Sequence, residues 1–335
     1  MAVDCQFCGT SVLLPDTGAV VVNKQREQSA FQLPVHYEDQ DRIIHNYHSQ
    51  SQLLESLHII FQKSNPNEWI HILNKDHSQS FPINVQHLYE RMKHPELASV
   101  IYKGAFKSHL QPIVYLEDYN IFGYESLLRT TTANVSPGDL FSFAHNAGLH
   151  SMLDQKARRA AVQAKSEQID QGQKIFINFL PSTIYVPEFC LKHTFQMVKE
   201  FDIDPKDIIF EVVETEKITD VNHLKSIFDT YKASGMKVAL DDVGAGFSTL
   251  EMLTLLQPDY VKIDRSYIQD CHQNLEHQNF LKEVINRATH FGIYVLAEGI
   301  ETKEEADWLR SAGIHFGQGY YFGKPSTNPQ KKITL

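Results

Sequence analysis

The chain has 335 residues, of which 42% are hydrophobic and 21% charged, and this is the composition of an ordinary globular protein. Intrinsically disordered proteins are excluded because they are poorer in apolar residues, and collagen-like proteins because they are far richer in glycine. The formal net charge of −10 disfavours binding to DNA and to other anions. An anionic substrate would therefore need metal ions or a local group of Lys and Arg side chains.

No targeting or membrane-spanning segment is expected. No apolar stretch approaches the ~18 residues that cross a bilayer, and the amino-terminal sequence MAVDCQFCGTSV lacks the basic region and apolar core of a signal peptide. The four cysteines, Cys5, Cys8, Cys190 and Cys271, are too few and too scattered for a disulfide framework. We therefore expect a cytoplasmic protein with reduced thiols.

The sequence Cys5-Gln6-Phe7-Cys8 resembles half of a zinc ribbon, but no second pair of cysteines with this spacing follows. A four-ligand site would have to recruit distant histidines such as His36 or His45. Whether Cys5 and Cys8 bind metal stays open.

Residues 1–95 are rich in His, Gln, Ser and Asn and predict a small α+β region. An amphipathic helix is predicted from Asp41 to Gln62, a short strand from Trp69 to Leu73 and a helix from Val85 to Met92. We separate this region from a second domain at residues 96–335, because Lys93-His94-Pro95 breaks the pattern. Residues 1–95 could serve as a sensor, a dimerisation module or a support, and a regulatory role is favoured because a barrel needs no extra core to fold.

From about residue 109 onward, β-branched or aromatic runs alternate with stretches of helical periodicity, which is the pattern of βαβ units. The runs are apolar throughout, as in a parallel sheet that helices cover. Seven or eight such units over roughly 225 residues suit a (β/α)8 barrel, although an open doubly wound sheet has the same local pattern. The predicted strands are Gln111 to Leu116, Ile121 to Leu128, Lys174 to Leu180, Asp207 to Val213, Lys237 to Val243, Asp259 to Asp264, Tyr294 to Ile300 and Gly319 to Lys324.

The first of these units differs from the others. Gln111 to Leu116 and Ile121 to Leu128 are separated only by the turn-forming residues 117–120, which predicts a hairpin. One strand of the sheet is therefore expected to be antiparallel.

Acidic side chains recur where the predicted strands end. In a parallel barrel these ends open on one face, so the side chains should converge there. A single acid at a strand end is most often a helix cap, but acids on five strands, with an amide on a sixth, are hard to assign to capping. Such a concentration of negative charge calls for a hard divalent cation, and oxygen ligands select Mg2+, Mn2+ or Ca2+ over zinc. The side chains are Glu125, Asn178, Glu211, Glu214, Asp241, Asp242, Asp264, Glu298 and Glu301.

The adjacent pair Asp241-Asp242 is the most informative of these. One carboxylate could bridge two ions while the other binds the second, and two ions ~3.5–4 Å apart are typical of phosphate-ester displacement. Lys262 either extends along the barrel edge or reaches this site, where it could orient the attacking water or offset developing charge. Arg129 could hold a substrate phosphate through its planar guanidinium.

Taken in order, these segments resemble the EAL-domain family of cyclic di-GMP phosphodiesterases over about residues 100 to 327. Each match is weak alone, whereas eight in order with family-like spacing are specific. The matching segments are Gln111-Pro112-Ile113-Val114, Glu125-Ser126-Leu127-Leu128-Arg129, Asn178 with Pro181, Glu211-Val212-Val213-Glu214, Asp241-Asp242-Val243-Gly244-Ala245-Gly246-Phe247-Ser248, Lys262-Ile263-Asp264, Ala297-Glu298-Gly299-Ile300-Glu301-Thr302 and Gln318-Gly319-Tyr320-Tyr321-Phe322-Gly323-Lys324-Pro325.

The resemblance implies a (β/α)8-like barrel with an antiparallel first strand and two bound Mg2+ or Mn2+ ions. It implies hydrolysis of one phosphodiester bond of cyclic di-GMP to linear pGpG, which lowers a bacterial second messenger. Two alternatives stay open: a catalytically silent cyclic di-GMP receptor that signals through residues 1–95, and a barrel enzyme acting on another phosphoester. A homodimer formed through the barrel is expected from the family.

The resemblance also assigns roles to single residues. Glu125, Asp241, Lys262 and Glu298 match catalytic positions, and Glu214 matches a glutamate that steadies the loop after the Asp pair. The substrate-binding positions match Gln111, Leu128, Arg129, Glu301 and Gln318. The implied metal ligands are Glu125, Asn178, Glu211, Asp241, Asp242 and Glu298, with Asp241 bridging the two ions.

The chain departs from the family pattern at few positions. Ser126 stands where the motif has alanine, a small-for-small change that we expect to be tolerated. The loop after the Asp pair has Val243, Ala245 and Phe247 in place of Phe, Thr and Tyr. Losing the threonine and tyrosine hydroxyls removes two potential hydrogen bonds, so the order of this loop, and with it turnover or its regulation, is expected to differ.

Overall fold

The computed structural model describes residues 14–24, 31–63, 68–76, 79–132, 134–212, 220–244 and 250–334. Cys5 and Cys8 lie outside these residues. The chain forms two compact units, one made of residues 1–105 and 130–153 and the other of residues 106–129 and 154–335. None of the described helices combines the length and apolar character needed to cross a bilayer.

The first unit contains an antiparallel five-stranded sheet in the order β2-β3-β1-β4-β5. Alternate side chains of its strands, such as Val20 and Val22, are buried together with Leu53 and Leu57 of α1 and Leu88 of α2. The elements of this unit are β1 (Gly18–Asn23), β2 (Val35–Glu38), β3 (Arg42–Tyr47), α1 (Gln50–Lys63), β4 (Trp69–Asn74), β5 (Ser80–Asn84), α2 (Val85–Lys93), α3 (Pro95–Lys103) and α4 (Pro137–Asn146).

The helix predicted from Asp41 to Gln62 is wrong in its first part, because β3 occupies residues 42–47 and α1 begins only at Gln50. The β-branched pair Ile43-Ile44 favours a strand, and this strand pairs along its whole length with β1. The strand predicted at Trp69 and the helix predicted at Val85 are present, each one residue longer than expected. The side chain of Asn84 accepts hydrogen bonds from the first turn of α2 and thereby fixes where that helix begins.

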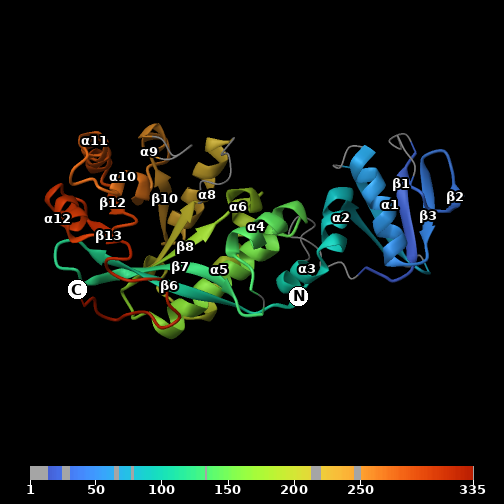
Figure 1. The fold of residues 1–335 in the computed structure, drawn as a ribbon, viewed down its shortest axis with the longest axis horizontal. Helices are drawn as coiled ribbons and strands as arrows, with labels where there is room; N and C mark the ends of the chain where they lie inside the picture. Colours follow the sequence, from blue (N-terminus) through green and yellow to red (C-terminus); the bar gives the residue numbers. More distant parts are fainter. Residues whose placement is uncertain are drawn as a thin grey trace. The chain divides into compact units, whose positions relative to one another are not determined.

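The second unit is a closed eight-stranded barrel in the order β10-β11-β12-β13-β6-β7-β8-β9 (Figure 1). Strand β6 runs antiparallel to β13, whereas the successive pairings from β7 through to β13 are parallel. The predicted barrel with one reversed strand is therefore confirmed, and the open-sheet alternative is wrong. Its strands are β6 (Phe106–Tyr115), β7 (Ile121–Thr130), β8 (Lys174–Phe179), β9 (Ile208–Val212), β10 (Lys237–Val243), β11 (Tyr260–Ile263), β12 (Tyr294–Ala297) and β13 (Phe316–Gln318).

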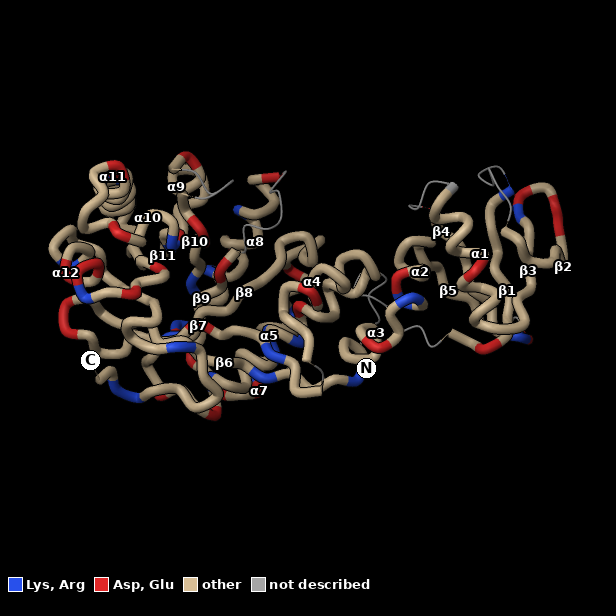
Figure 2. Tube along the Cα trace, in the orientation of Figure 1, with Lys and Arg blue, Asp and Glu red and all other residues tan. Residues whose placement is uncertain are grey.

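Helices lie outside the barrel strands (Figure 1). Their apolar faces join the outward side chains of the strands in one large core. Acidic and basic positions are interspersed along the chain (Figure 2). The α-helices are α5 (His150–Gln168), α6 (Pro187–Cys190), α7 (Lys192–Glu200), α8 (Val221–Ala233), α9 (Leu250–Leu256), α10 (Arg265–Ile268), α11 (Leu275–Phe291) and α12 (Lys303–Ser311).

The last strand differs from its prediction, because β13 covers Phe316–Gln318 and the segment from Gly319 to Lys324 turns away. A Cβ atom on Gly319 would lie 2.0 Å from the carbonyl oxygen of Ile300. The chain can pass this close to the loop after β12 only because residue 319 is glycine. The apolar run of the sequence therefore marks a packed turn here and not a strand.

The barrel interior has an apolar layer directly below a polar one. The apolar layer includes Phe176, Ile209, Ala239, Tyr260, Leu296 and Phe316. Because side chains two residues apart on a strand share a face, each of these positions places the residue two further along at the carboxyl end of the interior. Those residues are Asn178, Glu211, Asp241, Lys262, Glu298 and Gln318.

Candidate metal centre and active site

Lys262 lies at the centre of the polar layer. Its Nζ atom is 2.8 Å from Glu211 Oε2, 3.0 Å from Asp241 Oδ1, 2.5 Å from Glu298 Oε1 and 4.0 Å from Glu125 Oε1. The side chain is 1% exposed, so it does not extend along the barrel edge to solvent. Carboxylates from β7, β9, β10 and the end of β12 thus surround one ammonium group.

Burial and mutual repulsion dominate the electrostatics of this layer. Burial raises the pKa of Glu211, Asp241 and Glu298, although the Lys262 ammonium opposes the shift. Burial also favours the neutral form of Glu125, but there Lys262 and the hydrogen bond from Gln318 prevail and lower the pKa. For Lys262 burial alone would lower the pKa, and the surrounding carboxylates reverse this and raise it well above its ordinary value. The layer therefore holds more carboxylates than its lysine can neutralise.

Two amides complete the layer. Asn178 Nδ2 lies 2.8 Å from Glu211 Oε1 and 3.2 Å from Glu125 Oε1, and donates to both. Gln318 Nε2 donates to Glu125 Oε2 at 2.6 Å and to Gln111 Oε1 at 3.1 Å. A half-turn of the Asn178 amide would bring its oxygen toward the same space, where it could serve as a metal ligand.

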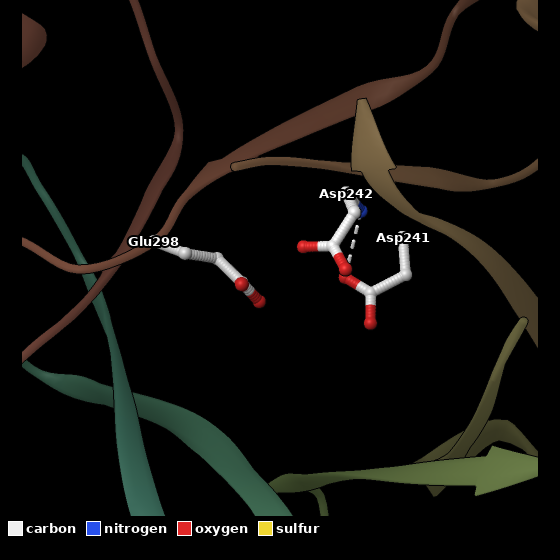
Figure 3. Close-up of side chains that lie close together, drawn as sticks. All are labelled: Asp241, Asp242 and Glu298. Atoms are coloured by element: carbon white, nitrogen blue, oxygen red, sulfur yellow. Dashed lines mark hydrogen bonds between the residues drawn. The ribbon is translucent and has the colours of Figure 1, made fainter. Parts of the chain in front are cut away.

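Asp241, Asp242 and Glu298 form a candidate metal centre. Each offers a carboxylate oxygen, and these oxygens all lie within 4.8 Å of one another. Figure 3 shows Glu298 reaching toward the Asp pair from the opposite side, and the backbone N–H of Asp242 donating to Asp241 Oδ1 at 3.0 Å. The backbone of Asp242 has a φ of 51°, a left-handed conformation that aspartate tolerates better than most residues, so both neighbouring carboxylates can be presented at one place.

The residues fit a hard divalent cation. The donor set consists of carboxylate and amide oxygens, which suits Mg2+ or Mn2+ and not zinc. Glu211 Oε2 and Glu298 Oε1 are buried without a hydrogen bond of ordinary geometry among the described residues, and contact Lys262 as ion pairs. Added positive charge would stabilise such oxygens.

A pocket of about 200 Å3 opens beside this layer. Several predicted site residues line it, namely Gln111, Glu125, Glu298, Glu301 and Gln318. The pocket is also lined by four residues that were not predicted as site residues from the sequence, Arg265, Gly299, Gly319 and Tyr320. Arg265 follows β11 by two residues, so the strand-end rule that found the acids could have found it as well.

Arg265 is the cation among the described residues that line this pocket. Its Nη2 atom lies 2.9 Å from Glu301 Oε1. Its stem crosses Gly299, where a Cβ atom would come within 2.5 Å of Arg265 Cγ. Gly299, which has a φ of 73°, therefore makes room for the arginine.

The structure does not bring every predicted residue to the pocket. Leu128 and Arg129 are half-buried on β7 and are not among its lining residues, and Arg129 Nη1 donates to the carbonyl oxygen of Leu128 at 2.7 Å. Glu214, Ala245 and Phe247 lie outside the described residues. Val243 is buried at the end of β10.

Ser126 lies beside the candidate ligand Glu125 but bonds in a different direction. Its hydroxyl is 2.7 Å from the hydroxyl of Ser108 on β6, and both side chains are buried. The hydroxyl that distinguishes this chain from the family motif thus has a hydrogen-bond partner on the neighbouring strand. Burying it leaves no polar group unpaired.

Comparison with known proteins gives a family. A family model described as the EAL domain matches residues 96–325. The chain belongs to the EAL-domain family. A solved EAL-domain structure, that of a standalone versatile EAL protein from Vibrio cholerae O395 in its c-di-GMP-bound form, is 35% identical, with a TM-score of 0.63 over 69% of this chain and 97% of that one.

Curated relatives are named as probable cyclic di-GMP phosphodiesterases. One is named a probable cyclic di-GMP phosphodiesterase, PdeB of Escherichia coli K12, and is 31% identical over 69% of this chain and 45% of its own length. The chain spans about half the length of the curated relatives that it matches at 31–32% identity. The structure of Klebsiella pneumoniae BlrP1 in a manganese/cy-diGMP complex is 22% identical and shares the fold, with a TM-score of 0.63 over 95% of this chain and 98% of that one.

Proposed function

We propose that the chain hydrolyses one phosphodiester bond of cyclic di-GMP to give linear pGpG, using two divalent metal ions. The observation that carries the proposal is the convergence of Asp241, Asp242 and Glu298 beside the buried Lys262. The names of the relatives support the same substrate. A receptor without catalytic activity would not need a buried layer that holds more carboxylates than Lys262 can neutralise.

The proposed ligands divide between two ions. Glu125, Asn178, Glu211 and Asp241 would hold one, Asp241 and Asp242 the other, and Glu298 would complete the centre. Mg2+ or Mn2+ bound there would supply a nucleophilic hydroxide at neutral pH and charge neutralisation for the phosphate.

The remaining steps belong to the chain's own side chains. Lys262, fixed by its ion pairs, would orient the attacking water and offset negative charge that develops at phosphorus. Gln318 and Gln111 line the pocket. Gln318 holds Glu125 in place by donating a hydrogen bond to its Oε2 atom, and Gln111 accepts a second hydrogen bond from the Gln318 amide. Glu301 and Arg265 offer an acceptor and a cation to the nucleotide.

The proposal is tested by incubating the purified chain with cyclic di-GMP and Mn2+ and separating the products by chromatography. Asp241→Asn should remove pGpG formation, and the matched change Asp229→Asn, on the exposed surface of α8, should not. Binding of cyclic di-GMP without any pGpG in the wild type would select the receptor instead. Hydrolysis of another phosphoester in preference to cyclic di-GMP would instead indicate a barrel enzyme with a different phosphoester substrate.

We also propose a regulatory role for residues 1–95 next to a phosphodiesterase domain at residues 96–335, and a homodimer formed through the barrel. The hydrophobic core that the first unit has of its own supports a separate, regulatory role for residues 1–95. Light scattering of the intact chain tests the dimer, and turnover of a chain beginning at residue 96 tests the regulation.

A further inference from the structure

Asn178 lies where strand β8 loses one of its neighbours. The register between β7 and β8 ends at the pair Ser126 and Ile177, whereas the register between β8 and β9 continues through Asn178 and Phe179. At Asn178 the ladder therefore supports β8 from the β9 side. The course of the chain just after β8 then matters for where the Asn178 amide lies.

Asp154 of α5 holds this part of the chain. Its side chain is 1% exposed, and its Oδ1 atom accepts a hydrogen bond from the backbone N–H of Leu180 at 3.1 Å. Its Oδ2 atom lies 3.2 Å from the Thr183 hydroxyl. One buried carboxylate thus binds both ends of the turn that begins two residues after Asn178.

Arg158 neutralises Asp154 from the next turn of the same helix. Its Nη2 and Nε atoms lie 2.8 and 3.0 Å from Asp154 Oδ2, and its Nη1 atom donates to the hydroxyl of Thr194 on α7. Burial favours the neutral form of Asp154, and its pKa is raised although Arg158 opposes the shift. Because desolvating two charges is costly, a buried pair of this kind contributes little net stability and is better explained by the conformation that it fixes.

We propose that Asp154 is a positioning residue for the metal centre, which acts by holding the Leu180–Thr183 turn and thereby the Asn178 amide. The inference rests on the proposed function, since it takes Asn178 as a metal ligand. It assigns Asp154 no contact with metal or substrate.

Asp207, which lies near the start of β8, provides a matched control for Asp154, which lies near the end of that strand. Asp207 is 3% exposed and lies 3.2 Å from Lys165 Nζ of α5 and 2.8 Å from Lys174 Nζ, at the start of β8. It also accepts a backbone hydrogen bond from Gly172. Asp154 and Asp207 are thus both buried acids that pair with a cation on α5 and accept a hydrogen bond from a backbone N–H near β8. They differ in that the hydrogen bonds of Asp154 lie close to Asn178, whereas those of Asp207 lie at the start of β8.

The test is a calorimetric Mn2+ titration of the intact chain without substrate, for wild type, Asp154→Ala, Asp154→Asn, Asp207→Ala and Asp207→Asn. Asp154→Ala should weaken Mn2+ binding about 10-fold, the lower end for a residue that orients a metal ligand. Asp154→Asn should fall between it and wild type, because the asparagine oxygen can still accept from Leu180. Both Asp207 variants should bind Mn2+ as wild type does while unfolding at lower temperature, since each leaves a buried cation unpaired.

Equal Mn2+ affinities in the Asp154 and Asp207 variants would overturn the inference and leave the proposed function intact. If Asp154→Ala does not fold, the comparison of Asp154→Asn with Asp207→Asn decides, with at least a 3-fold loss of affinity expected for the former alone. A wild-type chain that binds no Mn2+ would instead contradict the proposed function itself. In the phosphodiesterase assay, Asp154→Ala should need more Mn2+ for half-maximal rate while the KM for cyclic di-GMP stays unchanged.

Discussion

Lys262 Nζ lies 2.8 Å from Glu211 Oε2, and neither side chain is more than 1% exposed. The lysine therefore acts as a built-in cation for a group of acids that burial would otherwise neutralise. It can remain there when metal binds, because the acids outnumber it. Charge balance in this layer is what links the fold to the proposed chemistry.

Changing Lys262 to Met should separate stability from turnover. Without metal the variant should be less stable, by about 3 kcal/mol, because it leaves buried carboxylates without their partner. Mn2+ should still bind and should raise the unfolding temperature more than in wild type, while pGpG formation falls at least 100-fold, the range for a lost oriented charge. Thermal unfolding with and without Mn2+, together with the hydrolysis assay, measures both. Wild-type turnover in this variant would remove Lys262 from the mechanism.

Removing metal should stop turnover and lower stability together. Chelation leaves the acids around Asp241 and Glu298 without compensating charge, so the unfolding temperature should fall and return when Mn2+ is added. Mg2+ should support hydrolysis as well, whereas Ca2+ should not, because its longer and less regular coordination spoils the two-ion geometry. Product formation in the three metals checks this, and equal rates with Ca2+ and Mg2+ would speak against two-ion catalysis.

Arg265 and Arg129 should differ in their effects on substrate binding. Arg265 lines the pocket, and Arg129 bonds to the neighbouring backbone on β7. Arg265→Ala should raise the KM for cyclic di-GMP about 10-fold, the size of one charged hydrogen bond, with little change in Mn2+ affinity. Arg129→Ala should raise the KM less than 3-fold. The reverse order would show that Arg129, and not Arg265, contacts the substrate.

The first unit should lose stability in mild acid through His87. Burial, and to a lesser extent the nearby side chains of Arg91, His150 and His145, lower the pKa of His87 to about 4. Since the unfolded chain then binds more protons between pH 6.5 and 4, stability falls as the pH decreases through this window. Urea unfolding at several pH values should show a smaller decrease for His87→Gln than for wild type. The matched change of the exposed His48 to Gln should leave the wild-type slope, and an unchanged slope in both variants would exclude His87 as its source.

The barrel could be predicted because its strands carry two signals at once. Positions such as Ile209 and Glu211, or Tyr260 and Lys262, combine an apolar run with a polar residue two places further on, and both signals depend on the strand alone. The N-terminal sheet could not be predicted in the same way. Ile43 and Ile44 fit a helical pattern as well as a strand, and only pairing with β1 decides between them.

The sequence also could not distinguish the two candidate arginines. Arg129 follows Glu125 by four residues and satisfies the family pattern, yet the direction of its guanidinium depends on the local backbone. Arg265 reaches the pocket because Gly299, distant in sequence, leaves room for its stem. Such relations between separate loops are set by tertiary packing.

Crystals grown with Mn2+ and measured for its anomalous scattering would show whether Asp241, Asp242 and Glu298 hold two metal ions. We expect two anomalous peaks, with Asp241 contacting both, Asp242 contacting one, and Glu298 beside them. Peaks elsewhere, or a centre in which Lys262 remains the sole cation at saturating Mn2+, would contradict this expectation.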